Sequence, residues 1–283
     1  MNDDAPLTFA DLGLAPDVLK AIDELGYETP SAIQAGAIPP LLAGRDLLGQ
    51  AQTGTGKTAA FALPMLQGLD LDRPDVQAVV LTPTRELAMQ VAAAVRGYGR
   101  YVGKHGVRVL PVYGGQPIHI QQKALQRTVH VVIGTPGRVM DHLRRGTLDL
   151  GGVRFFCLDE ADEMLNMGFL EDVEWILGHA HAERQIALFS ATLPAPIRRI
   201  AERYLHDPAD VKFHQETLTV EGIEQWSLKV PRHRKLEALE RLLGLEDYDA
   251  ILVFVGTQRA AAELAEHLEA RGLGAECIHG GMN

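Results

Sequence analysis

The chain has 283 residues, 46% of them hydrophobic and 23% charged, and it carries a formal net charge of -10 at pH 7. This length allows one large domain or two smaller ones, and the charged fraction is ordinary for a soluble globular protein. The acidic balance argues against broad non-specific binding to nucleic acid, although it does not exclude a local basic groove.

The N-terminal stretch MNDDAPLTF is acidic and has no apolar segment, so no signal peptide is expected. Further along the chain, the uninterrupted apolar runs are of strand length and well short of a bilayer span. We therefore expect a cytoplasmic protein that has no membrane partner.

Short apolar runs recur within the first 213 residues. They cover residues 46–50, 78–83, 107–113, 130–135, 155–159 and 186–192. Stretches with helical spacing lie between most of these runs, as at 84–98 and 195–205. Apolar strands that alternate with helices indicate an α/β fold, in which helices cover both faces of a mostly parallel sheet.

A polar stretch without periodicity, residues 214–222, predicts a linker between a domain at 1–213 and a second unit at 223–283. In the second unit the pattern predicts strands at 223–230, 250–255 and 275–280 and helices at 234–245 and 259–272. Roughly 60 residues is small for a stable α/β domain, so this unit is predicted to be incomplete.

A phosphate-binding loop is predicted directly after the first apolar run. It consists of Ala51, Gln52, Thr53, Gly54, Thr55, Gly56, Lys57 and Thr58. The pattern is G-x-x-x-x-G-K-[ST] with Ala51 in the position of the first glycine, and it lies between a predicted strand and a helix that begins near Lys57, as the motif requires. A glycine-rich turn with an incidental lysine is the alternative.

The residue types in this loop suit nucleotide phosphates. Gly54 and Gly56 allow backbone N–H groups to converge on phosphate oxygens, and the helix N-terminus adds partial positive charge. Lys57 is expected to reach the β- and γ-phosphates, and the Thr58 hydroxyl to bind Mg²⁺. The sequence thus predicts binding of ATP or ADP with Mg²⁺.

The apolar run at 155–158 ends in an acidic cluster. Its carboxylates are Asp159, Glu160, Asp162 and Glu163. Such charge at the end of a buried strand is unfavourable unless a positive species compensates it. In P-loop enzymes an acidic residue at the end of a neighbouring strand holds Mg²⁺, so we expect Asp159 to bind the metal and Glu160 to orient and deprotonate the attacking water. A preference for acids at a helix N-terminus is the alternative, and it explains Asp162 and Glu163 well enough.

Residues 159–162 read D-E-A-D, and together with the phosphate loop they resemble the DEAD-box RNA helicases. The resemblance follows the whole chain in order, and it includes features of the bacterial cold-shock and ribosome-assembly members. It implies an ATP-dependent enzyme with RecA-like domains: an ATP-binding domain at 1–213 and the first part of a second RecA-like domain at 223–283.

An adenine-recognition element is implied by the segment GYETPSAIQ, within about residues 7–35. By resemblance, Gln34 would hydrogen-bond the adenine edge, since an amide offers both a donor and an acceptor. Tyr27 and Phe9 would pack around the base.

The resemblance also implies RNA contacts at three segments that follow predicted strands. The residues are Pro83, Thr84, Arg85, Gly114, Gly115, Thr135, Pro136, Gly137 and Arg138. Contacts to phosphates and sugars carry no base information, so RNA binding is expected to be independent of sequence. From the residues alone, a helix cap at Thr84 and a turn at Gly114 and Gly115 are equally good readings.

Asp162 is expected to couple the nucleotide to RNA through hydrogen bonds with Ser190 and Thr192. The alternative for Ser190 is a helix cap. The family further implies arginines near the γ-phosphate in a segment that would follow Asn283, so we expect this chain to bind nucleotide but hydrolyse it slowly, as a truncated piece of a longer helicase.

The predicted function is ATP-dependent RNA helicase activity, with local duplex unwinding on single-stranded RNA. Ribosomal or RNA-degradation assemblies are predicted partners. Two alternatives are a non-catalytic, nucleotide-dependent RNA-binding module and a DNA translocase of the same superfamily.

Overall fold

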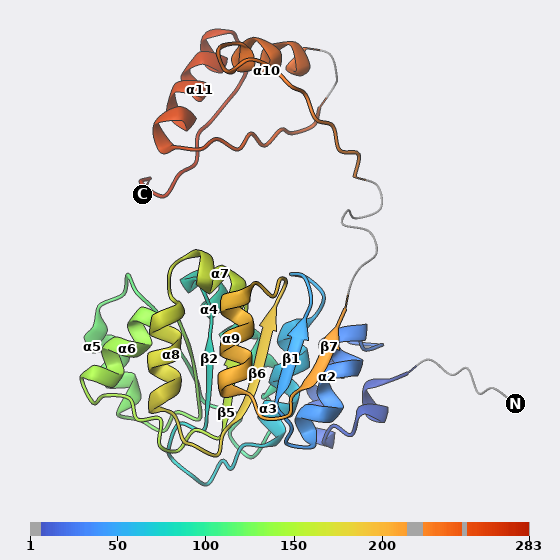
Figure 1. Ribbon diagram of the computed structural model, residues 1–283, viewed down its shortest axis with the longest axis vertical. Coiled ribbons are helices and arrows are strands. Elements are labelled where there is room, and N and C mark those ends of the chain that lie inside the picture. The colour runs from blue at the N-terminus through green and yellow to red at the C-terminus, as the bar shows by residue number, and fades with distance from the viewer. Residues whose placement is uncertain (1–6, 214–222, 245–247, 283) are drawn as a thin grey trace, which may run out of the picture. The chain divides into compact units, whose positions relative to one another are not determined.

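The computed structural model describes residues 7–213, 223–244 and 248–282. The chain divides into two units, residues 1–218 and 219–283 (Figure 1). The predicted linker 214–222 lies outside the described residues. Within the described ranges, no helix combines the length and the apolar character needed to cross a membrane.

The first unit is built on one seven-stranded parallel sheet, in the order β3-β4-β2-β5-β6-β1-β7. The strands are β1 (Leu47–Gln50), β2 (Ala78–Leu81), β3 (Val109–Val112), β4 (Val131–Gly134), β5 (Phe155–Leu158), β6 (Gln185–Ser190) and β7 (Ala209–Lys212). The first six overlap the apolar runs predicted as strands.

β7 was not predicted as a strand, and its position explains why. It pairs only with β1 at the edge of the sheet, and its residues alternate between half-buried and exposed. An edge strand with Asp210 and Lys212 on it has no continuous apolar run, whereas every residue of β2, β4 and β5 is buried.

Helices cover both faces of this sheet. They are η1 (Phe9–Leu12), α1 (Pro16–Glu24), α2 (Ala32–Leu42), α3 (Lys57–Gln67), α4 (Arg85–Tyr98), α5 (Ile118–Leu125), α6 (Pro136–Arg144), α7 (Ala161–Asn166), α8 (Leu170–His179) and α9 (Ala195–Tyr204). Ala78 and Val80 pack in one core with α1 to α4, whereas Val79 and Leu81 pack in a second core with α6 to α9. Figure 1 shows α8 and α9 in front of the sheet. The predicted α/β fold is confirmed.

The second unit contains η2 (Arg232–Arg234), α10 (Lys235–Leu243) and α11 (Gln258–Ala270). The helices match the prediction, but the three predicted strands are wrong, because the described residues of 223–230, 250–255 and 275–280 form no ladder. A strand needs hydrogen bonds from a neighbouring strand, which an apolar pattern does not supply. The side chains of the unpaired segments are largely solvent-exposed: Trp226 by 90%, Phe254 by 87% and Ile278 by 89%.

Candidate functional site

Three of the predicted site segments lie at the carboxyl edge of the sheet. The phosphate loop follows β1, the acidic cluster follows β5, and Ser190 ends β6. In parallel α/β sheets this edge is where ligands bind. The acidic cluster does not follow a strand that neighbours β1, as expected from P-loop enzymes, because β6 lies between β1 and β5. Chain order does not reveal which strand is inserted between two others.

The phosphate loop is held open by two glycines in the left-handed region and by bonds from α2. Gly54 has φ +82° and Gly56, which caps α3, has φ +94°. Ser31 Oγ donates to the carbonyl of Thr55 at 2.8 Å, and Gln34 Nε2 donates to the carbonyl of Gly56 at 3.1 Å. The φ of Gly56 would strain any residue with a side chain, and a Cβ there would also displace the Gln34 amide that bonds the loop, so this position favours glycine.

The predicted adenine element lies beside this loop. Gln34 is buried, and its Oε1 accepts from the Ser31 N–H at 2.8 Å while its Nε2 bonds the loop. Phe9 meets Tyr27 edge to face, with ring centroids 5.9 Å apart, and the Tyr27 hydroxyl lies 2.7 Å from that of Tyr98. Sequence reasoning missed Ser31 and Tyr98. The spacing Ser-x-x-Gln is a capping box and signals Ser31, whereas nothing local signals Tyr98.

Asp159 and Lys57 form the charged centre of the site. Both are buried, and among the described residues Asp159 Oδ1 has no hydrogen-bond partner. Burial raises the pKa of Asp159 to about 6, while Lys57 opposes the rise and Glu160 adds to it. A buried carboxylate oxygen without a partner is costly unless a cation completes it, so these residues fit Mg²⁺.

The described residues do not hold three or more His, Cys, Asp or Glu side chains grouped as a metal site. A hard cation beside Asp159 would therefore take most of its oxygen ligands from nucleotide phosphates and water, as Mg²⁺ commonly does. The Thr58 hydroxyl, in the first turn of α3, is the further protein ligand predicted for it.

Glu160 has a strained backbone. Its φ of 56° and ψ of 54° lie in the left-handed region, which is uncommon for a residue other than glycine. Glu160 Oε1 accepts from Thr53 Oγ1 at 3.3 Å, which joins the acidic cluster to the phosphate loop across β6. The turn thus directs this carboxylate towards the loop.

Asp162 is tied to the end of β6. Its Oδ2 accepts from the Thr192 N–H and hydroxyl, both at 2.8 Å, and its own N–H donates to Ser190 Oγ at 3.2 Å. Burial raises the pKa of Asp162, but the hydrogen bonds with Thr192 and Ser190 outweigh it, and the pKa lies below its usual value. The bonds are present, and their coupling role stays a prediction.

Replacing Asp159 by asparagine is expected to stabilise the nucleotide-free protein at pH 7.5 by on the order of 2 kcal/mol. The folded-state pKa of Asp159 is above that of the unfolded chain, so stability from this group is full below the ordinary value of 3.8 and is lost as pH rises through about 6. Asparagine is neutral at every pH and avoids that loss. Urea unfolding without Mg²⁺ at pH 4.5 and 7.5 measures the difference, which should shrink at pH 4.5.

Asp162→Asn is the matched control, with the opposite sign. The folded-state pKa of the Asp162 carboxyl is lowered below its ordinary value of 3.8. The ionised carboxylate therefore stabilises the fold at a pH above 3.8, and this contribution is lost as pH falls. Asp162→Asn should therefore destabilise at pH 7.5. A loss of stability in both variants would contradict the assignment of Asp159 as an uncompensated buried charge.

The predicted RNA residues gather at α4, α6 and the turn before α5. Thr84 caps α4, accepting from the Leu87 N–H at 3.2 Å, so the helix-cap reading is correct for it. Gly115 has φ +85°, and a Cβ there would lie 3.1 Å from an Arg85 guanidinium nitrogen, which places this turn against the start of α4. Thr135 is the N-cap residue of α6 and Pro136 is the first residue of that helix, but Thr135, unlike Thr84, makes no side-chain cap hydrogen bond.

Arg138 differs from the other predicted RNA residues. Its side chain is only 13% exposed. One guanidinium nitrogen donates to the carbonyl of Gln116 at 2.9 Å and to Gln121 Oε1 at 3.1 Å. Its bonds are thus inside the protein, and a direct contact with RNA stays a prediction.

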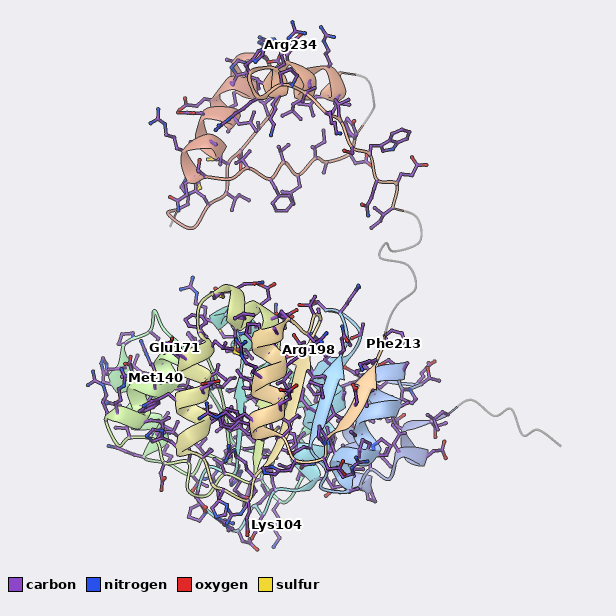
Figure 2. All side chains as sticks on the ribbon, in the orientation of Figure 1. Lys104, Met140, Glu171, Arg198, Phe213 and Arg234 are labelled. Atoms are coloured by element: carbon purple, nitrogen blue, oxygen red, sulfur yellow. The ribbon has the colours of Figure 1, made fainter. Side chains whose placement is uncertain are left out.

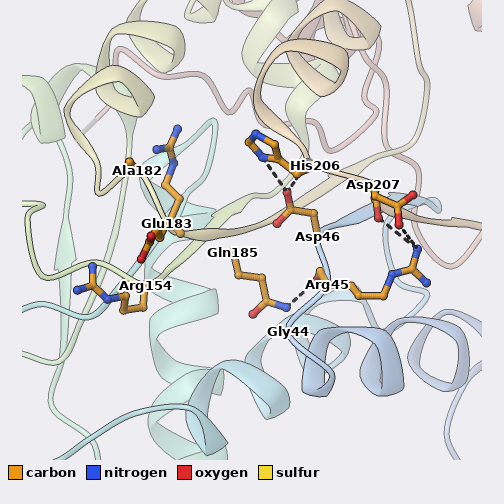
Figure 3. A pocket seen from close by; sticks show the side chains of 10 residues that line it. Gly44, Arg45, Asp46, Arg154, Ala182, Glu183, Gln185, His206 and Asp207 are labelled. Atoms are coloured by element: carbon orange, nitrogen blue, oxygen red, sulfur yellow. Dashed lines mark hydrogen bonds and ion pairs between the residues drawn. The ribbon is translucent and has the colours of Figure 1, made fainter.

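A cavity of about 590 Å³ lies at the opposite edge of the sheet (Figure 3). Its lining residues precede or begin β1, β5, β6 and β7, at the amino ends of the strands. At one side of this cavity Arg45 pairs with Asp207 at 3.6 Å, as the dashed lines in Figure 3 show. This cavity has no part in the site at the carboxyl edge.

Comparison with known proteins finds one family. A family model described as DEAD/DEAH box helicase matches residues 31–200. The ATP-dependent RNA helicase DeaD of Mycobacterium tuberculosis is 53% identical over 96% of this chain and 48% of its own length. The DEAD-box ATP-dependent RNA helicase CshA of Geobacillus kaustophilus is 50% identical over 98% of this chain and 58% of its own length. The chain thus spans about half the length of the curated relatives it matches.

Two solved structures share the fold. A DEAD box protein from the hyperthermophile Methanococcus jannaschii superposes with a TM-score of 0.70 at 41% identity, covering 98% of this chain and 74% of that one. A variant of Dbp5 from S. cerevisiae, bound to RNA and ADP BeF3, superposes with a TM-score of 0.79 at 32% identity, covering 94% of this chain and 67% of that one.

Proposed function

The chain belongs to the DEAD/DEAH box helicase family, and we propose on that basis that it binds ATP with Mg²⁺ and single-stranded RNA and couples ATP hydrolysis to local unwinding of RNA duplexes. The observation that carries the proposal is the unpartnered, buried Asp159 Oδ1, together with the buried Lys57 at the start of α3, whose charge lowers the pKa of that carboxyl. A bound nucleotide would supply phosphates for Lys57, and the cation of that nucleotide would supply the missing partner for Asp159 Oδ1.

Each group of the site has a task in this proposal. Lys57 binds the β- and γ-phosphates, and Thr58 and Asp159 hold the cation, which neutralises charge on the phosphates when bound. Glu160 orients the attacking water and accepts its proton. Gln34, already bonded to the loop, reads the adenine edge with its remaining amide capacity.

RNA is proposed to bind along the starts of α4 and α6 and the turn before α5. Helix N-termini and glycine turns offer backbone N–H groups to phosphates, so recognition would not depend on base sequence. The Dbp5 structure, which is bound to RNA, supports this substrate class. Ribosomal or RNA-degradation partners and a cytoplasmic location stay predictions.

The first experiment measures ATP turnover by the 283-residue chain with and without single-stranded RNA, beside Mg·ADP binding. We propose that turnover by this chain alone is slow, because the 283 residues hold no match to the arginine-rich segment that the family implies. Stimulation by RNA and not by DNA would support the helicase, equal stimulation would favour a DNA translocase, and RNA binding without turnover a non-catalytic module. Failure to bind Mg·ADP would contradict the proposal.

A further inference from the structure

A buried polar network lies beneath the exposed glycine turn before α5. Its centre is Gln121, which is 1% exposed, and His142, which is 0% exposed. Resting on the RNA-binding function proposed above, we infer that Gln121 and His142 are positioning residues, which hold the turn 113–116 in the form that receives the RNA backbone. Neither residue touches the RNA in this proposal.

The orientation of the Gln121 amide is fixed by its partners. Its Nε2 donates to the carbonyl of Tyr113 at 3.0 Å, and its Oε1 accepts from an Arg138 guanidinium nitrogen at 3.1 Å. A carbonyl only accepts and a guanidinium only donates, so the amide cannot be reversed. The same Nε2 also donates to Gln116 Oε1 at 3.0 Å.

The tautomer of His142 follows from that orientation. Its Nε2 lies 3.0 Å from Gln121 Oε1, which only accepts, so Nε2 carries the proton. Its Nδ1 lies 2.8 Å from the Thr147 hydroxyl, which is shared between this nitrogen and the carbonyl of His142 at 3.2 Å. Burial lowers the pKa of His142, and Arg138 acts in the same direction, which agrees with a neutral ring. A neutral imidazole thus holds the Gln121 amide from the side opposite the turn.

The network acts on both ends of the turn. The carbonyl of Tyr113 is held by Gln121, and the carbonyl of Gln116 accepts from Arg138 at 2.9 Å. Between them, Gly114 and Gly115 are exposed, and Gly115 lies against Arg85 at the start of α4. Burying so many polar groups is costly unless all are bonded, and here each bond constrains the turn or a group that constrains it.

The test is RNA affinity, measured by anisotropy of a labelled single-stranded RNA with Mg·ATP analogue, beside Mg·ADP affinity and the urea midpoint. Gln121→Met keeps the side-chain length and removes every bond of the amide. We expect its RNA affinity to fall about fivefold or more, since hydrogen bonds to two ends of the turn are lost. Its Mg·ADP affinity should stay as in the wild type.

Two further sets of variants distinguish a loss of positioning from a general loss of stability. Gln185→Met removes an amide that donates to the carbonyls of Leu41 and Arg45 at 2.8 and 2.7 Å, at the far edge of the sheet, and should leave RNA affinity unchanged. His142→Leu should weaken RNA binding, and His142→Gln, which keeps a donor on a long side chain, should restore part of it.

The outcomes separate this inference from the function it rests on. A wild-type chain that binds no RNA would overturn the proposed function and the inference with it. Wild-type RNA binding that is unchanged in Gln121→Met would overturn the inference alone. Equal losses of RNA and Mg·ADP affinity in Gln121→Met would also overturn it, because that pattern belongs to a residue that only stabilises the domain.

Discussion

Replacing Lys57 by alanine is expected to weaken Mg·ADP binding by about 10- to 100-fold, the equivalent of losing hydrogen bonds from a charged donor to phosphate. Lys57 opens α3 directly behind the glycine at position 56, and it is buried. Its ammonium therefore has few competing partners and loses little hydration when phosphate arrives. Calorimetric titration with Mg·ADP measures the effect, and ATP turnover should be lost with it.

Removing Lys57 acts on Asp159 as well. The lysine lowers the pKa of that carboxyl, so its loss should leave Asp159 harder to ionise and weaken the binding of Mg²⁺. Lys104→Ala is the matched control, because Lys104 is exposed and lies at the lower edge of the first unit in Figure 2, whereas α7 lies at the upper edge in Figure 1. Wild-type affinity in Lys57→Ala would mean that the loop does not hold phosphates through this residue.

The parts of the fold that were predictable are those with an unbroken local pattern. β2, β4 and β5 are buried along their full length and therefore read as apolar runs. β7 was not predicted because it pairs only with β1 at the edge of the sheet and has no continuous apolar run. In the second unit the same apolar pattern predicted strands that do not form in the described residues, since a pattern encodes which faces are apolar but not whether a partner strand is present.

The same distinction between local sequence patterns and contacts between elements applies to the candidate site. The phosphate loop and the acidic cluster are contiguous motifs, and the sequence therefore names their residues. The bond between Gln34 and Gly56 joins different elements, as does the contact between Gln121 and His142. Such pairs depend on how helices pack on the sheet, and a single sequence contains no local signal of that packing.

Glu160→Gln is expected to slow RNA-stimulated ATP turnover by about 10²- to 10⁴-fold, the usual contribution of a general base, while leaving Mg·ADP affinity unchanged. Glutamine keeps an oxygen that accepts from Thr53 Oγ1, so the bond across β6 survives. What is lost is the ability to take a proton from water. Single-turnover hydrolysis with excess protein measures this even where steady-state turnover is slow.

Glu163→Gln distinguishes proton transfer from a general effect of negative charge. Glu163 lies in the first turn of α7, three residues after Glu160, and its removal changes the net charge and the field at the helix terminus by a similar amount. Turnover should be unchanged in Glu163→Gln. Equal losses in the two variants would assign the effect to electrostatics of the α7 N-terminus and remove Glu160 as the base. A loss confined to Glu160→Gln would assign proton transfer to the Glu160 carboxylate. The left-handed backbone of Glu160 directs that carboxylate towards the phosphate loop, where the chemistry takes place.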